Sequence, residues 1–240
     1  MRVFQKYAAE FFGTLVLVGI GTGTIIGIGG IQDSSGIVAV ALAFGLALMT
    51  ALYTVGGVSG GHFNPATSLA AFLDRRIGLV DLLGYWVAQV AGALAASAVF
   101  AWVLDRNAVA ATYTRISRPV VNELSGFVAE AVFTLVFVFA VLVLEKSQAH
   151  TKYIGMGVAL TAVHFVGIAF TGASVNPART FAPALIGGSW DGFWVFVAGP
   201  AVGAILAWAF YKIIIEGDWK LGDDPVEVRD AVVEGAEETL

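Results

Sequence analysis

Two copies of the tripeptide Asn-Pro-Ala constrain this chain more than any other feature. The first copy is Asn64, Pro65 and Ala66, and the second is Asn176, Pro177 and Ala178. They lie 112 residues apart (176 minus 64), close to half of the 240 residues. Each copy follows a Gly-rich turn and precedes a short apolar run. Matching flanks in matching places indicate an internal duplication.

The composition indicates an integral membrane protein. Hydrophobic residues make up 58% of the chain, charged residues only 13%, and the mean hydropathy is +0.83. Soluble domains are nearer one quarter charged. The sequence lacks the roughly 10-residue alternation typical of outer-membrane strands. We therefore expect packed helices and an all-α membrane fold.

Six apolar stretches are long enough to cross a bilayer, which takes ~20 residues per helix. They are residues 8–30, 36–56, 80–104, 123–144, 153–171 and 193–215. The apolar runs after the two triplets, residues 65–73 and 177–186, would reach only ~15 Å as helices. Half-length helices in these positions indicate re-entrant segments that meet inside the protein. Residues 1–215 would form one channel-like domain.

Each half of this domain holds three spans and one half-helix. Because three is odd, the halves (residues 1–104 and 123–215) should face opposite ways, as an inverted repeat. Two further landmarks agree with this pairing. The stretch around Glu10 resembles the stretch around Glu130, and residues 89–93 resemble residues 200–204.

Lysine and arginine predict the orientation. With six spans, both termini lie on one side, which would hold nine of these residues against three on the other side. Cytoplasmic loops carry the excess of positive charge, so both termini are predicted to be cytoplasmic. Residues 216–240 hold nine acids and two bases, a net charge of −7. We expect a solvated acidic cytoplasmic tail there.

Asn-Pro-Ala at the start of a half-helix has a specific chemistry. Asn is a favoured N-cap, and Pro suits the first helical position. Capping uses the side-chain oxygen and leaves the NH₂ group as a donor. Two such helix starts at the membrane midplane would present two donors and two positive dipole ends. This arrangement suits a pore for neutral molecules and opposes the passage of cations.

These motifs make the chain resemble the aquaporin family, also called major intrinsic proteins, over about residues 5–215. The stretch Ser59-Gly60-Gly61-His62-Phe63-Asn64-Pro65-Ala66 looks most like that of bacterial water-selective members. The resemblance implies six transmembrane helices and two re-entrant half-helices in an inverted repeat. It also implies a homotetramer in the cell membrane, with one pore in each subunit.

The resemblance further implies four positions that line a selectivity filter. Counted from the two Asn residues, they are Phe44, His164, Ala173 and Arg179. Phe, His and Arg together resemble the water-selective pattern, and Arg179 would repel cations. Ala173 departs from it, because water-selective relatives often carry Thr or Cys there. The smaller side chain removes a polar contact and favours a slightly wider gap.

Three further polar residues need a separate explanation. Glu10 and Glu130 are costly within a membrane, and their duplicated placement predicts that each accepts hydrogen bonds from a re-entrant loop. A proton relay is the rival interpretation. His62 is interpreted as a brace for its loop, with a pore gate as the alternative.

The leading hypothesis is a passive channel that conducts single-file water and excludes protons and ions. The alternative is a facilitator of glycerol or another small neutral solute, such as ammonia, hydrogen peroxide or carbon dioxide. An enzyme is not expected, since the chain has no Cys, no metal-ligand cluster and no nucleophile elbow, and therefore no cofactor is expected. The expected partners are water, the lipid bilayer and further copies of the chain, with no nucleic acid.

Overall fold

The computed structural model describes residues 3–117, 120, 122–149 and 151–217, and its secondary structure there is helical. Six helical segments within these residues are long and apolar enough to span a membrane. The segments are α1 (Val3–Gly27), α2 (Ser34–Ala51) continued by η1 (Leu52–Gly56) and α3 (Gly57–Ser59), α5 (Leu79–Val103), α7 (Glu123–Glu145), α8 (Lys152–Thr171), and α10 (Val195–Tyr211) continued by η2 (Lys212–Glu216). The six-span prediction is confirmed.

The bounds of five segments agree with the predicted spans to within three residues, but the first differs more. We predicted a start at residue 8, whereas α1 begins at Val3. Lys6 lies in this first part of the helix, and its ammonium group pairs with a carboxylate oxygen of Asp81 on α5 at 2.9 Å. A charge so close to a helix end can be solvated or paired, and hydropathy alone therefore placed the start too late.

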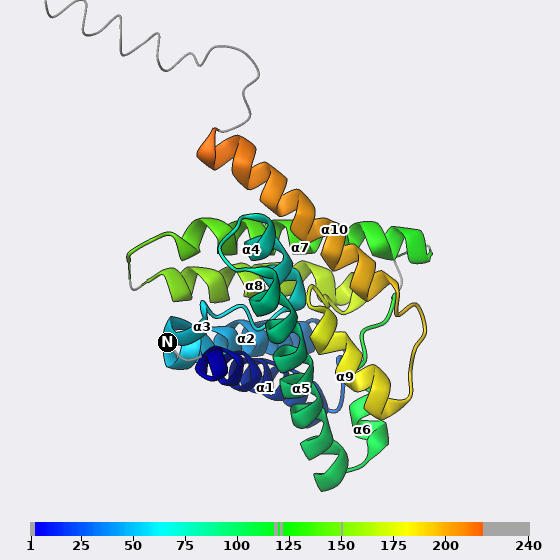
Figure 1. The fold of residues 1–240 in the computed structure, drawn as a ribbon. Coiled ribbons are helices and arrows are strands. Elements are labelled where there is room, and N and C mark those ends of the chain that lie inside the picture. The colour runs from blue at the N-terminus through cyan, green and yellow to red at the C-terminus, as the bar shows by residue number, and fades with distance from the viewer. Residues whose placement is uncertain (1–2, 118–119, 121, 150, 218–240) are drawn as a thin grey trace, which may run out of the picture.

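The two short helices are α4 (Pro65–Leu73) and α9 (Pro177–Gly187). Both begin with Pro directly after an Asn whose side chain caps the helix. α9 ends at Gly188, which adopts a left-handed conformation (φ +76°) and closes the helix. In Figure 1 neither helix runs the length of its neighbours, and α9 lies beside α6 (Arg106–Ala110), a short helix that we did not predict.

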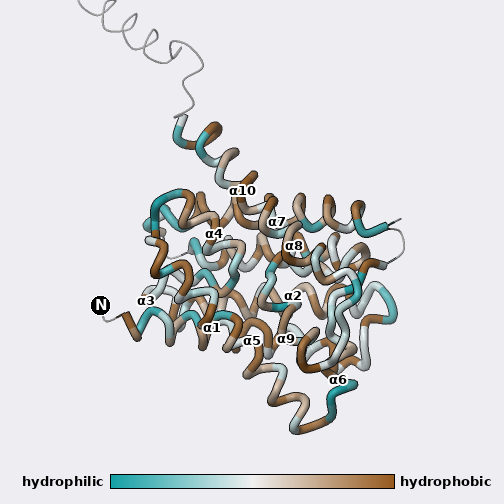
Figure 2. The backbone as a smooth tube through the Cα atoms, turned by 45° about the vertical axis from the view of Figure 1, so that its right-hand side comes forward, coloured by the Kyte–Doolittle hydropathy of each residue, from teal (hydrophilic) through white to brown (hydrophobic). Residues whose placement is uncertain are grey.

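The same pairing of helices occurs in both halves. α1 packs along α5, α7 packs along α10, and α2 meets α8 across the two halves. In Figure 2 hydrophobic residues dominate the long helices, and much of the hydrophilic colour lies at helix ends and connections. Many large hydrophobic side chains on these helices are exposed, among them Val87 and Trp102 on α5 and Val158 on α8.

Two glycines permit this close helix pairing. A Cβ atom at Gly92 on α5 would lie 2.2 Å from the carbonyl oxygen of Phe11 on α1. A Cβ atom at Gly203 on α10 would lie 2.4 Å from the carbonyl oxygen of Ala131 on α7. Phe11 and Ala131 directly follow Glu10 and Glu130, so the two halves use the same crossing in the same register. Small residues at such contacts let helices approach in lipid.

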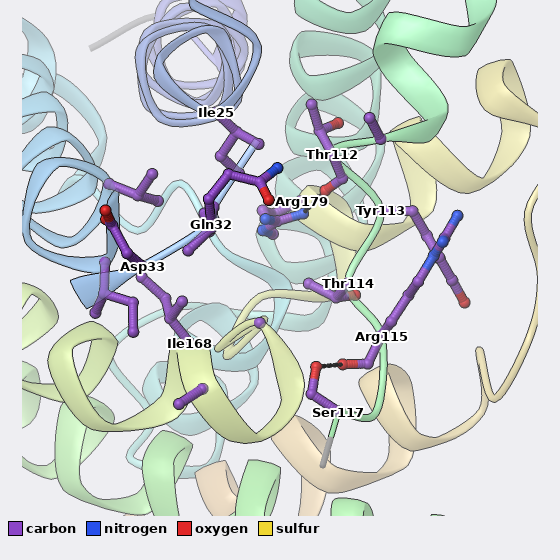
Figure 3. Close-up of a pocket in the computed structure, with 16 residues that line it drawn as sticks. Ile25, Gln32, Asp33, Thr112, Tyr113, Thr114, Arg115, Ser117, Ile168 and Arg179 are labelled. Carbon is purple, nitrogen blue, oxygen red and sulfur yellow. Dashed lines mark hydrogen bonds between the residues drawn. The ribbon is translucent and has the colours of Figure 1, made fainter. Parts of the chain in front are cut away.

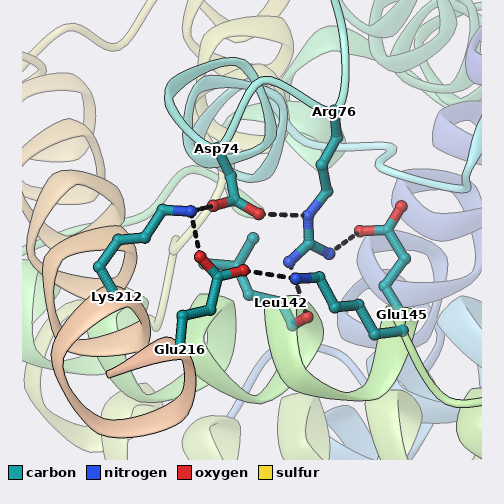
Figure 4. Close-up of polar contacts among 7 residues, drawn as sticks. Asp74, Arg76, Leu142, Glu145, Lys212 and Glu216 are labelled. Atoms are coloured by element: carbon teal, nitrogen blue, oxygen red, sulfur yellow. Dashed lines mark hydrogen bonds and ion pairs between the residues drawn. The ribbon is translucent and has the colours of Figure 1, made fainter. Parts of the chain in front are cut away.

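An ion-pair network holds the end of α4 (Figure 4). Arg76 pairs with Asp74 at 2.7 Å and with Glu145 of α7 at 2.6 Å, and it donates to the carbonyl oxygen of Leu142 at 2.9 Å. Lys212 of η2 pairs with the second oxygen of Asp74 at 2.6 Å. Desolvation by burial alone would lower the pKa of Arg76, but the hydrogen bonds and charges of Asp74 and Glu145 outweigh it and raise that pKa.

The predicted acidic tail falls mostly outside the described residues, which end at residue 217. Its first residue, Glu216, is the last of η2. Its carboxylate pairs with Lys146 at 2.5 Å and also with Lys212.

Gly92→Ala tests the helix crossing. The added methyl group meets backbone atoms, which cannot rotate away, so we expect a loss of about 1–3 kcal/mol of stability. The measurement is the thermal unfolding of the purified protein in detergent. Gly27→Ala is the matched control, because a Cβ there has nothing within 4 Å. Equal unfolding temperatures for both variants would contradict the proposed crossing.

Candidate functional site

Each of the two Asn side chains forms a hydrogen bond to the re-entrant loop of the opposite repeat. Each Asn oxygen caps its own helix, since Asn64 accepts from the N–H of Ala66 at 2.8 Å and Asn176 from that of Ala178 at 3.0 Å. Each Asn nitrogen donates across the repeat, from Asn64 to the carbonyl of Val175 at 2.7 Å and from Asn176 to that of Phe63 at 2.9 Å. A side-chain amide has two N–H groups, so each Asn keeps one donor for the pore. Our sequence argument left both N–H groups free.

These hydrogen bonds between the repeats require a left-handed backbone conformation at the residue before each Asn. Phe63 has φ +50° and Val175 has φ +43°. Left-handed conformations are unfavourable for bulky and β-branched residues. The strain persists because the conformation directs each carbonyl oxygen at the Asn of the opposite repeat. Sequence reasoning missed both residues, although their matching places before the two triplets were visible.

Two fully buried carboxylates accept the hydrogen bonds of the re-entrant loops. Glu10 accepts from the N–H groups of His62 at 3.0 Å and Phe63 at 2.7 Å. It also accepts from the hydroxyl of Ser59 at 2.6 Å and the amide of Gln89 at 2.8 Å. All of its partners are donors in the loop or on α5. The geometry supports the predicted role in loop support.

Glu130 repeats this arrangement in the second half. It accepts from the N–H groups of Ser174 at 2.9 Å and Val175 at 2.8 Å, and from the hydroxyl of Thr171 at 2.6 Å. Thr171 occupies the place of Ser59. Both carboxylates therefore face hydrogen-bond donors of the loops and helices around them. This arrangement argues against a role for either carboxylate in a proton relay.

Phe44, His164 and Arg179 converge at one constriction. The rings of Phe44 and His164 stack with centroids 4.6 Å apart, and the guanidinium carbon of Arg179 lies 5.3 Å from the Phe44 ring centre. Nδ1 of His164 lies 3.0 Å from the carbonyl oxygen of Leu160. Because a carbonyl can only accept, Nδ1 carries a proton, and in a neutral ring Nε2 is then an acceptor.

The polar atoms that remain free at the constriction are complementary. Nε2 of His164 and Nε of Arg179 are buried and have no hydrogen-bond partner among the described residues. Nη1 of Arg179 is held by the carbonyl oxygen of Thr112 at 2.8 Å. An acceptor and a donor are thus available to one small molecule that can both donate and accept. Thr112 lies in the connection before α7, and no sequence signal pointed to it.

Two cavities meet at Arg179. The outer one is a vestibule of about 440 Å³ lined by the loop at residues 111–117 and the start of α2 (Figure 3). The inner one is lined by Phe44, His164, Arg179 and both Asn residues, and its volume is about 10 Å³. A cavity holds one water molecule when the centre of that molecule has about 10–15 Å³ of volume to move in. The inner cavity is therefore about the size of one water molecule.

Two predicted site residues have distinctive positions. Ala173 is fully buried with φ +47° and lines neither cavity. Its Cβ lies 2.8 Å from where a Cβ of Gly167 on α8 would be. His62 lines the inner cavity, and its Nδ1 also contacts the hydroxyl oxygen of Ser68 at 3.0 Å. The structure thus brings His62 to the passage and directs Ala173 toward α8.

Comparison with known proteins finds matches over most of the chain. Residues 1–211 match the family model described as major intrinsic protein. The chain is 38% identical over 209 residues to "Glycerol uptake facilitator protein-like 6" of Lactiplantibacillus plantarum, covering 85% of this chain and 94% of that protein. It is 36% identical over 228 residues to "Aquaporin Z" of Brucella melitensis, covering 90% and 100%.

A solved structure has the same fold. The X-ray structure of the aquaglyceroporin from Plasmodium falciparum superposes with a TM-score of 0.79. The match covers 89% of this chain and 97% of that chain, at 22% sequence identity. At this identity the likeness concerns the fold alone.

Glu130→Gln tests the support of the second loop. The substitution replaces an acceptor oxygen with an NH₂ group that faces N–H and O–H donors, so buried donors lose their partners. We expect at least ~2 kcal/mol of destabilisation and a loss of flux. Thermal unfolding and flux in proteoliposomes measure both. Glu123→Gln, at the start of the same helix, is the control and should behave like the natural protein; a stable, fully active Glu130→Gln variant would refute the role.

Proposed function

This chain belongs to the major intrinsic protein family and is a membrane channel rather than an enzyme, and we propose that it conducts water in single file. The observation that carries the proposal is the inner cavity of about 10 Å³, which reaches from Phe44, His164 and Arg179 to the two Asn residues. It has room for about one water molecule, whereas glycerol is several times larger. The free acceptor on His164 and the free donors on Arg179 fit the two hydrogen-bonding functions of water.

The same geometry supports the exclusion of ions and protons. The half-helices α4 and α9 direct their positive ends at one point, and each Asn offers a donor there. A water molecule that accepts from both Asn residues points its oxygen at them. It then cannot accept a hydrogen bond from the next water in file. Arg179 adds a permanent positive charge beside the constriction.

We further propose the sites and the setting. Asn64, Pro65, Ala66 and their counterparts in α9 form the pore centre. Phe44, His164 and Arg179 form the filter, with Ala173 as its backing, while Glu10, Glu130 and His62 support the loops. Residues 1–215 form the channel, as a homotetramer in the cell membrane. Both termini are cytoplasmic, and the vestibule therefore opens to the outside.

Glycerol transport is the second candidate. It is favoured by the similarity to a protein named as a glycerol uptake facilitator. It is opposed by His164, whose ring stacks on Phe44 and fills the corner that a three-carbon chain would need. Other small neutral solutes, namely ammonia, hydrogen peroxide and carbon dioxide, remain alternatives of the same kind.

Permeability measurements on the natural protein distinguish the two solutes. Proteoliposomes should shrink much faster than empty liposomes in an impermeant osmolyte, and glycerol should enter at a rate close to that of empty liposomes. Stopped-flow light scattering measures both rates in one preparation. Fast glycerol entry with slow water flux would show that the chain is a glycerol facilitator.

His164→Ala tests the constriction directly. Removal of the imidazole opens the passage beside Phe44, so we expect glycerol permeability to rise severalfold while water flux is retained. The control is Phe165→Ala, which removes a neighbouring ring that is exposed on α8. If glycerol permeability stays at the natural level in His164→Ala, the filter lies elsewhere in the pore.

A further inference from the structure

The two re-entrant loops are each closed by the same side-chain bridge. Residue −2 from Asn bonds to residue +4 in both repeats. In the first, Nδ1 of His62 lies 3.0 Å from the hydroxyl of Ser68, and in the second, the hydroxyl of Ser174 lies 2.6 Å from that of Thr180. All four side chains are at least 96% buried.

The third partner of this bridge differs between the repeats. In the first, the amide of Gln89 on α5 donates to Ser68 at 2.9 Å. In the second, Thr180 contacts the hydroxyl of Thr114 at 2.8 Å. Gln89 belongs to a membrane-spanning helix, but Thr114 belongs to the loop that joins the two halves. The second bridge therefore fastens a connecting loop to the pore.

The direction of the hydrogen bonds in the second repeat follows from their endpoint. Ser174 donates to the carbonyl oxygen of Asn176 at 3.0 Å, which uses its only hydroxyl proton. Thr180 must then donate to Ser174, and Thr114 must donate to Thr180. The chain of donors runs from Thr114 through Thr180 and Ser174 to the Asn of the triplet. Each hydroxyl proton has one acceptor, and no other order satisfies all of them.

This hydroxyl chain lies next to the group that holds Arg179. Thr112, two residues before Thr114, accepts from Nη1 of Arg179 through its carbonyl oxygen at 2.8 Å. Thr180 directly follows Arg179. The loop is thus fastened to α9 at Thr114 and grips the guanidinium at Thr112. Its remaining support includes Tyr113, whose hydroxyl donates to the carbonyl of Asp191 at 2.9 Å.

We infer that Thr180 and Thr114 are positioning residues for the selectivity filter. They hold the loop so that the carbonyl of Thr112 fixes one end of the Arg179 guanidinium and leaves Nε free at the constriction. This inference rests on the proposed filter and deepens it, because it makes discrimination between water and glycerol depend on a hydroxyl pair outside the constriction.

The consequence of breaking the pair follows from its burial. Thr180→Val keeps the shape of the side chain but removes the buried acceptor of the hydroxyl proton of Thr114. Thr114→Val removes the same contact from the other side. In either variant the loop is no longer fastened beside Thr112, so the guanidinium gains freedom and the constriction widens.

A double-mutant cycle on transport tests this inference. Water and glycerol permeabilities are measured in proteoliposomes for Thr114→Val, Thr180→Val and the double variant. We expect each single variant to lower the ratio of water to glycerol permeability about threefold to tenfold, the effect of losing one buried hydrogen bond. The double variant should be no worse than Thr180→Val alone, because Thr180→Val already lacks the contact that Thr114→Val removes.

Two further variants separate positioning from loss of structure. Thr180→Ser retains the hydroxyl and should restore the natural ratio. Thr134→Val makes the same change at a buried hydroxyl that has no partner among the described residues, and it should leave the ratio unchanged. Thr114 lies in a loop, so Thr114→Val remains informative should Thr180→Val fold poorly.

Two outcomes would overturn the inference: natural ratios in both valine variants, or a double variant whose effect is the product of the two single effects. Neither depends on which solute the natural protein prefers. A natural protein that favours glycerol would refute the proposed water function, while the cycle would still report on the coupling between the hydroxyl pair and the filter.

Discussion

Backbone groups in a membrane interior must find partners within the protein, and every unusual feature of this chain follows from that requirement. The loops that lead into α4 and α9 are not helical, so their N–H groups have no partners of their own. Glu10 and Glu130 supply the acceptors from the middle of α1 and α7. With those donors satisfied, the two carboxylates can remain at a depth that would otherwise exclude them.

Once the loops are held, the remaining asymmetry between the repeats makes the site. Thr67 of the first repeat corresponds to Arg179 of the second, since both lie three residues after Asn. The triplets are therefore almost equivalent, but only the second repeat places a positive charge, that of Arg179, beside the passage. The partner of Arg179 is a carbonyl of the connecting loop, which has no counterpart in the first repeat. Arg179 accordingly lies where the vestibule and the inner cavity meet, and not at the pseudo-symmetric centre.

The sequence predicted the parts of this structure that depend on period, capping and duplication. The six spans and the length of both half-helices follow from the lengths of the apolar segments. The cap at each Asn follows from the Asn-Pro pair, because Asn is a favoured N-cap and Pro a favoured first residue of a helix. Counting from Asn176 also brought His164 and Arg179 to one place. The features that could not be predicted depend on backbone dihedral angles and on the directions of carbonyl groups. Nothing in the residue types says that Val175 adopts a positive φ, or that Thr112 points its carbonyl at Arg179.

Ala173 shows how a loop conformation changes the meaning of a residue. Its counterpart in the first repeat is Gly61, and both have positive φ, +47° and +74°. A small residue satisfies this backbone better than a β-branched one. The Cβ of Ala173 also lies 2.8 Å from where a Cβ of Gly167 would be, so there is little room on the α8 side for a longer side chain. The absence of a larger residue is therefore explained by the path of the loop, and the width of the passage is left to Phe44, His164 and the anchored Arg179.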